Sequence, residues 1–236
     1  MKRLLQSIKL DIQLQFRNGF YFVSAFVAAG TILLLSRFPE VDWTLFWPVI
    51  ILENLVVNTF FFMAGLVLLE KSEGTLEALI VSPLRPAEYL AAKIGSLGLL
   101  SLLETILVVL VISGPSFNWL WMLLGILSLV ALYILYSFFV VIRYDSIGEF
   151  ILPAALWSFG FSLPLFTYFE IWTSPLAYLH PLQAPLTLMK AAYQTIPSLE
   201  MVYALLYSAI WIFIGFRYSV RAHQQFVVRK QGVRHA

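Results

Sequence analysis

The sequence predicts an all-α polytopic membrane protein that forms a single transmembrane domain over residues 1–236. Hydrophobic residues make up 61% of the chain and charged residues 12%, which is about half the charged share of a soluble domain. Apolar runs long enough to cross a bilayer recur along the chain. The absence of cysteine and the wide spacing of the three histidines argue against disulfides and a metal site. A net charge of +2 is too small to indicate nucleic acid as a partner.

We expect six transmembrane helices. The apolar runs that predict them are, in chain order, 20–35, 44–69, 94–113, 119–142, 150–168 and 199–216. The first run is short, because a membrane helix needs roughly 17–25 residues. Pro153 and Pro164 interrupt the fifth run, where neighbouring helices can satisfy the carbonyls that a proline leaves free.

An even number of spans places both termini on the same side of the membrane. Thirteen of the fifteen basic residues fall on that side, and only Arg37 and Lys190 fall on the other. Basic residues accumulate in cytoplasmic loops, so we predict that both termini are cytoplasmic.

Two segments outside the spans have a predicted structure of their own. In residues 1–18, Leu4, Leu5, Ile8, Ile12 and Phe16 recur at helical spacing, which predicts an amphipathic helix lying on the inner leaflet. The alternative is a solvated basic tail. The outer segment 169–198 is apolar and rich in proline, and we expect a short helix at 182–193 that dips into the membrane or caps the bundle.

The inner loop 70–93 is predicted to hold a short helix at Thr75–Ser82. Charged residues from Glu70 to Glu73 are expected to carry the second span out of the lipid. Gly74 can adopt the left-handed conformation that ends a helix, and the threonine after it can cap the next one.

Ten residues of this loop form an ordered pattern: Glu73, Gly74, Thr75, Leu76, Glu77, Leu79, Ser82, Pro83, Glu88 and Lys93. The pattern resembles the inner loop of type-2 ABC exporter permeases. Six spans, inward termini, an amphipathic N-terminal helix and an outer segment before the last span agree with that family. The alternative is an amphipathic inner loop in some other polytopic membrane protein.

The resemblance implies that the helix at Thr75–Ser82 is a coupling helix, which docks on a separate ABC ATP-binding subunit. The residues expected to bind that partner are Glu73, Gly74, Thr75, Leu76, Glu77, Leu79, Ser82 and Pro83. ATP and Mg are then expected on the partner, because this chain has no Gly-x-x-x-x-Gly-Lys-(Ser/Thr) loop, and we expect no cofactor on the chain itself. A second permease copy or a paralogue would complete the pathway. The expected location is the plasma (inner) membrane of a prokaryote, and the expected cargo is a lipophilic or amphipathic compound such as a drug, lipid or glycolipid.

Four polar residues fall inside apolar spans: Glu53, Asn54, Asn58 and Glu104. A carboxyl within the bilayer is costly and normally faces the bundle interior, so these residues are candidates for a substrate pathway. The alternative is interhelical hydrogen bonding that fixes the packing. The rival function is a proton- or ion-coupled secondary transporter that uses Glu53 and Glu104, although the two halves of the chain show no inverted repeat. No catalytic constellation indicates a membrane enzyme.

Overall fold

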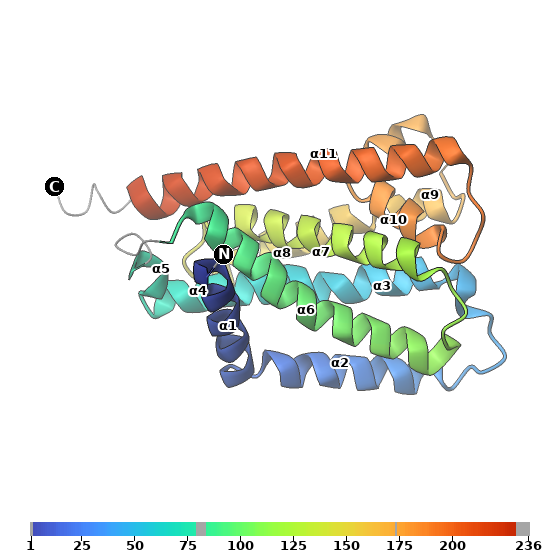
Figure 1. The fold of residues 1–236 in the computed structure, drawn as a ribbon, viewed down its shortest axis with the longest axis horizontal. Coiled ribbons are helices and arrows are strands. Elements are labelled where there is room, and N and C mark those ends of the chain that lie inside the picture. Colours follow the sequence, from blue (N-terminus) through green and yellow to red (C-terminus); the bar gives the residue numbers. More distant parts are fainter. Residues whose placement is uncertain (1, 79–83, 173, 230–236) are drawn as a thin grey trace.

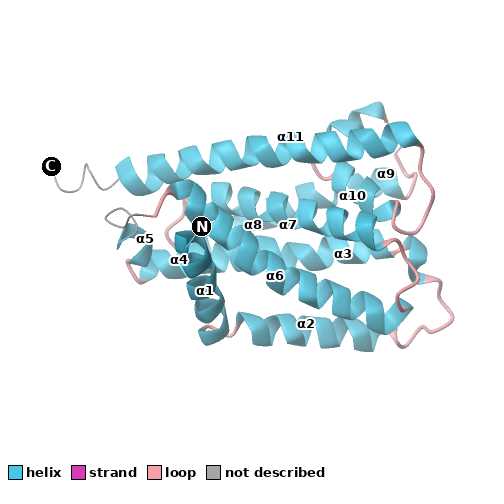
Figure 2. Ribbon diagram, in the orientation of Figure 1, coloured by secondary structure: helices cyan, strands magenta, loops and turns pink. Residues whose placement is uncertain are grey.

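The computed structural model describes residues 2–78, 84–172 and 174–229, and these residues form helices joined by short connections, with no strand among them (Figure 2). The elements are α1 (Lys2–Arg17), α2 (Phe20–Leu35), η1 (Trp43–Leu45), α3 (Trp47–Leu55), η2 (Val56–Phe61), α4 (Phe62–Ser72), α5 (Thr75–Ala78), α6 (Pro86–Ser113), α7 (Trp119–Val141), α8 (Ile147–Ser162), α9 (Pro164–Tyr168), η3 (Pro175–Leu179), α10 (Gln183–Lys190), α11 (Ser198–His223) and η4 (Gln224–Arg229).

Every predicted span coincides with a helix. Five helical stretches are long and apolar enough to cross a membrane: Trp47–Ser72, Pro86–Ser113, Trp119–Val141, Ile147–Tyr168 and Ser198–Phe226. The sixth, α2, has 16 residues and is about 24 Å long, which is short for a hydrocarbon core of about 30 Å. It is bent by 67° from α1, so the described chain has five spans, or six if this bent pair counts as one.

The long helices lie side by side along one axis, and the molecule therefore has two ends (Figure 1). The α5 end gathers α1, α5, the start of α6 and the end of α11. The α10 end holds η1, η3, α9 and α10. Within the outer segment, the expected helix at 182–193 is present as the shorter α10, which packs against α7 and α11.

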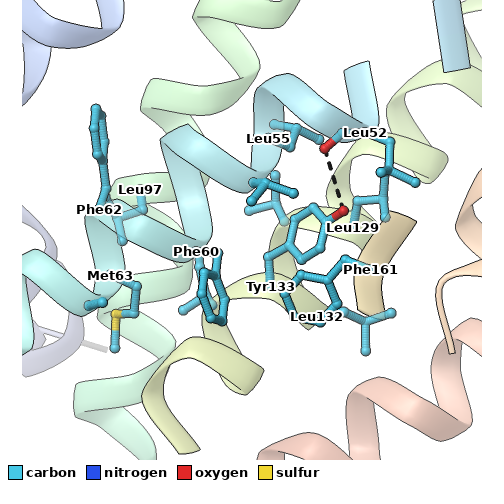
Figure 3. Packing of buried hydrophobic residues seen from close by; sticks show 14 of the residues in the cluster. Leu52, Leu55, Phe60, Phe62, Met63, Leu97, Leu129, Leu132, Tyr133 and Phe161 are labelled. Atoms are coloured by element: carbon cyan, nitrogen blue, oxygen red, sulfur yellow. Dashed lines mark hydrogen bonds between the residues drawn. The ribbon is translucent and has the colours of Figure 1, made fainter. Parts of the chain in front are cut away.

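The central helix is α7, which contacts α4, η2, α6, α10 and α11. Its buried side chains pack with those of α3 and α6 into one apolar cluster (Figure 3). Within this cluster the Tyr133 hydroxyl donates to the Leu52 carbonyl at 3.4 Å. In lipid, close van der Waals packing and such interhelical hydrogen bonds hold helices together.

The inner loop 70–93 contains the end of one helix and the start of another. α4 continues to Ser72, and α6 begins at Pro86, before the apolar run 94–113 that predicts the third span. Pro86 occupies the first turn, where a missing N–H costs nothing, and the Glu88 carboxylate accepts from the Arg85 N–H at 2.9 Å.

The face of α1 that packs most closely on α6 carries polar residues. Leu5 and Phe16 are exposed, whereas Asp11 and Gln15 are buried against α6. The helix turns a partly polar face inward because α6 offers polar partners there, which the periodicity of α1 alone does not reveal.

Candidate functional site

A glycine hinge connects α4 to α5. Gly74 has φ +69°, and a Cβ built on it would meet no atom within 4 Å. Its backbone conformation, rather than crowding, therefore favours glycine. The Ala78 N–H donates to the Gly74 carbonyl at 3.2 Å, and the Thr75 hydroxyl donates back to the Glu70 carbonyl at 3.1 Å. Gly74 thus precedes the first turn of α5, and the prediction that the Thr75 side chain caps this helix was wrong.

The helix α5 is anchored by one apolar side chain. Leu76 is 2% exposed, and α5 packs against α4 and η4. Thr75 and Ala78 are exposed, so this short helix presents part of its surface outward. Glu77 belongs to α5. The predicted site residues Leu79, Ser82 and Pro83 lie outside the described residues.

The end of α4 is clamped to the loop between α7 and α8. The Lys71 ammonium donates to the Ile142 carbonyl at 2.7 Å and to the Tyr144 carbonyl, and lies 3.3 Å from the Asp145 carboxylate. On the same end of α4, Glu73 lies 3.8 Å from the exposed Arg17 guanidinium, a pair that solvent screens strongly.

Beneath the hinge lies a buried charged group, which we call the Lys93 cluster: Asp11, Glu70, Tyr89 and Lys93. The Lys93 ammonium is 0% exposed, lies 2.7 Å from the Asp11 carboxylate and also pairs with the Glu70 carboxylate. The Tyr89 hydroxyl donates to the other Glu70 oxygen at 2.6 Å, and its ring lies 5.6 Å from that of His223. The cluster thus joins α1, α4 and α6, and its edge meets α11.

The sequence did not predict this cluster. Glu70 was expected to carry the second span out of the lipid, and its burial among polar side chains of α1 and α6 was not foreseen. A signal was nevertheless present, since Glu70 precedes the hinge by one helical turn and Tyr89 and Lys93 are also one turn apart. Which carboxylates meet Lys93 depends on how α1 and α4 dock on α6, and no local pattern contains that information.

Three of the four intramembrane polar residues form a second group, the Asn–Glu cluster of Asn54, Asn58 and Glu104. The Asn58 amide donates to the Glu104 carboxylate, and its nitrogen lies 2.9 Å from the side-chain amide of Asn54. With its amide nitrogen turned toward Glu104, Asn54 lies 3.1 Å from both carboxylate oxygens. Glu104 is 5% exposed, so this cluster joins α3 and η2 to α6 in the bundle interior.

Asn58 lies in a π-helical turn, η2, that the sequence did not predict. The turn is held from neighbouring helices, because Ser137 of α7 donates to the Phe60 carbonyl and Ser101 of α6 donates to the Asn58 carbonyl at 3.3 Å. Such turns occur often at functional sites.

Glu53 does not join its three predicted companions. Its side chain is exposed on the other face of α3 and accepts from the Ser162 hydroxyl of α8 at 2.7 Å. The structure therefore divides the predicted pathway residues into a buried group that links helices and one carboxylate on an outward surface.

Comparison with known proteins gives the family. A sequence model described as the fluoroquinolones export permease protein family matches residues 2–231 of the chain. The chain belongs to this family. Two curated relatives of the permease come from Mycobacterium tuberculosis, strains CDC 1551 / Oshkosh and ATCC 25618 / H37Rv, and each is called a fluoroquinolones export permease protein. Each is 28% identical over 236 residues, which cover 99% of this permease and 100% of the relative.

These matches confirm the resemblance to an ABC-type permease family that the inner loop indicated. The protein is a transmembrane export permease. The docking role of the loop residues around α5 and the pathway role of Glu53 and the Asn–Glu cluster stay predictions.

Proposed function

We propose that this permease is the membrane-spanning subunit of an ATP-driven ABC exporter and forms half of its translocation pathway. The α5 end would face the cytoplasm of a prokaryotic cell and bind a separate ABC ATP-binding subunit, which would hold ATP and Mg. A second copy of the chain, or a paralogue, would supply the other half. The cargo would be an amphipathic compound, and the name of the relatives suggests a fluoroquinolone.

The observation that carries this proposal is the set of contacts that joins α5 and the end of α4 to the bundle. The Gly74 hinge sets the angle of α5, Lys71 fixes the end of α4, and the Lys93 cluster lies directly behind them. A push on α5 would therefore move α1, α4 and α6 together, which is what a rigid-body switch between two states requires. Buried ion pairs are a weak source of stability but a good means of fixing one arrangement.

The exposed carboxylate of Glu53 supports the two-copy arrangement. An isolated carboxylate facing lipid is costly, and its hydroxyl partner Ser162 satisfies only part of its hydrogen-bonding capacity. A face shared with a second permease, or a water-filled pathway between the two, would place this group in polar surroundings.

The test compares two glycines with positive φ at opposite ends of the bundle. Gly74 and Gly114 have φ +69° and φ +68°, and neither has an atom within 4 Å of an added Cβ. Alanine at either position is strained by the backbone alone, so Gly74→Ala and Gly114→Ala should each lose about 1 kcal/mol of stability or more. We expect only Gly74→Ala, and Glu77→Arg beside it, to impair assembly with the ATP-binding subunit that copurifies in detergent, or vanadate-sensitive ATP hydrolysis by the complex.

Two outcomes would overturn the proposal. One is that no ATP-binding subunit copurifies and the α5 variants behave like Gly114→Ala. The other is export that continues in vanadate and stops when the proton gradient is collapsed, which would favour the ion-coupled transporter.

A further inference from the structure

The α10 end contains a cavity of about 420 Å³ that the loop motif and the family do not explain. Its walls come from α9, η3, α10 and the start of α11, and small-molecule sites typically occupy about 300–1,000 Å³. The side chains that matter for its chemistry are Tyr168, Glu170, Tyr178, Gln183, Lys190 and Glu200.

The charged groups of this cavity have no ion-pair partner within the described part of the chain. Glu170, Lys190 and Glu200 form none of the ion pairs there. The Lys190 ammonium lies over the Tyr168 ring, 5.8 Å from its centroid. One ammonium and two carboxylates thus face a shared cavity while remaining free to bind a ligand of both charges.

A buried amide in the same wall gives an independent indication of a ligand. Gln183 is only 7% exposed, and its Oε1 has no hydrogen-bond partner among the described residues. Leaving a buried polar group unpaired costs stability, so such a group is expected where a ligand completes its bonding. Thr187 does not fill this role, because its hydroxyl donates to the Gln183 backbone carbonyl at 2.9 Å.

The walls are held in place before any ligand arrives. Two tyrosines of α11 fix η3, since Tyr207 donates to the Leu179 carbonyl at 2.7 Å and Tyr203 donates to the Tyr178 carbonyl. A preformed cavity loses little freedom when a ligand binds.

We propose that this cavity is a binding site for a zwitterionic aromatic molecule that carries one carboxylate and one ammonium group. Lys190 pairs with the carboxylate, Glu200 and Glu170 pair with the ammonium, and the Tyr168 and Tyr178 rings contact the aromatic body. The inference rests on the proposed function in one respect: the ligand is a substrate of the exporter, held at its outward end.

The test measures equilibrium binding to the purified permease in detergent, without the ATP-binding subunit. The probe is norfloxacin, a fluorescent aromatic zwitterion, followed by fluorescence anisotropy, together with its decarboxylated and N-acetylated analogues. We expect Lys190→Gln to raise the Kd of norfloxacin by about tenfold, because the loss of a charge-assisted hydrogen bond weakens binding by about that factor. The same substitution should leave the Kd of the decarboxylated analogue unchanged. Glu200→Gln should weaken norfloxacin similarly and leave the N-acetylated analogue unchanged.

Arg37→Gln is the matched control, because Arg37 is a basic residue that does not line the cavity and lies in the connection after α2, whose last turn is at the same end of the bundle. Gln183→Leu gives a second readout: it should raise the melting temperature of the free protein while weakening norfloxacin binding. Equal Kd values in all variants, or the same loss for norfloxacin and its decarboxylated analogue in Lys190→Gln, would overturn the inference. If no ATP-binding subunit acts with the permease but the Kd values change as expected, only the proposed function fails. If the α5 variants impair ATP hydrolysis as expected but the Kd values do not change, only the assignment of the cavity fails.

Discussion

Lys93 lies at the centre of the buried charged cluster that joins α1, α4 and α6 at the α5 end of the bundle. Its ammonium is fully buried between the carboxylates of Asp11 and Glu70. Removing one member of such a group leaves an uncompensated charge in a medium that solvates it poorly, and this costs more than the intact group contributes. Substitutions in the Lys93 cluster therefore test whether it holds α1 and α4 on α6.

We expect Lys93→Met to lower the free energy of unfolding by about 3–5 kcal/mol, measured as thermal unfolding by tryptophan fluorescence in detergent. Lys9→Met is the control, because Lys9 is exposed on the same end in α1. Adding Asp11→Asn and Glu70→Gln to Lys93→Met should recover much of the loss, since no buried charge then remains unpaired. Equal melting of Lys93→Met and Lys9→Met would show that the cluster does not hold these helices together.

His180, at the α10 end, predicts a dependence of stability on pH. Burial lowers the pKa of His180 below its ordinary value of 6.5, and its Nδ1 accepts from the Leu182 N–H at 3.2 Å. The neutral form is favoured in the folded state, so its contribution to stability is fully present above the unfolded pKa and is lost as pH falls through the lower folded pKa. We expect the melting temperature to rise from about pH 5 to about pH 7.5.

The matched variant for this prediction is His180→Asn. Its side-chain oxygen can accept from the Leu182 N–H but does not titrate, so the rise of melting temperature with pH should be smaller than in the wild type. An identical pH profile in both proteins would assign the effect to other groups.

The sequence shows which polar residues lie within the apolar spans, but it predicts only part of what they contact. Asn54 and Asn58 are one helical turn apart, so their contact could be predicted. Their contact with Glu104 depends on the docking of α3 and η2 on α6. Glu53 does not contact them, because adjacent residues of a helix point to different faces. The spacing of residues along one helix does not predict which other helix it will dock on.

At the scale of elements, helix positions could be predicted and helix irregularities could not. Apolar runs reveal spans because the bilayer demands a minimum length. The π-helical turn η2 instead depends on hydroxyls supplied by other helices, Ser101 and Ser137, which satisfy carbonyls there. For the same reason, the burial of Glu70 at the end of α4 was not predicted, because it depends on contacts with α1 and α6.

The contact between α7 and α10 leaves no room for a side chain at Gly125. A Cβ there would lie 2.5 Å from Met189 Cγ, 3.0 Å from the Met189 backbone nitrogen and 3.2 Å from the Pro185 carbonyl oxygen. We expect Gly125→Ala to destabilise the protein by about 1–3 kcal/mol, because α10 must move away from α7. Thermal unfolding in detergent measures this.

Gly160→Ala is the matched control on α8, since an added Cβ meets nothing within 4 Å there. Alanine restricts the unfolded chain more than glycine does, so this change should be neutral or stabilising by up to about 1 kcal/mol. Opposite signs for the two substitutions are the expected result. Destabilisation of the same size in both would mean that helix α10 is not packed closely on α7.

At the scale of the whole molecule, the two ends of the bundle differ in charge as well as in structure. The basic residues on the side of the termini outnumber those on the other side by thirteen to two, and the structure gathers α1, α5 and the end of α11 at one end (Figure 1). The charge difference predicts the orientation, which stays a prediction, whereas no local pattern predicts the cavity at the α10 end, because its walls come from four elements that fold together.

Labelling of introduced cysteines tests this orientation. The chain has no cysteine of its own, so only the introduced thiol of the permease reacts. Ser72→Cys places an exposed thiol at the α5 end, and Ser116→Cys places one in the connection between α6 and α7, at the α10 end. A membrane-impermeant maleimide should label Ser116→Cys in intact cells and Ser72→Cys only in inside-out vesicles. Ser208→Cys, buried in α11, should be labelled only after denaturation. Labelling of Ser72→Cys in intact cells would place α5 outside the cell, where no ATP-binding subunit could reach it, and would thereby exclude coupling through α5.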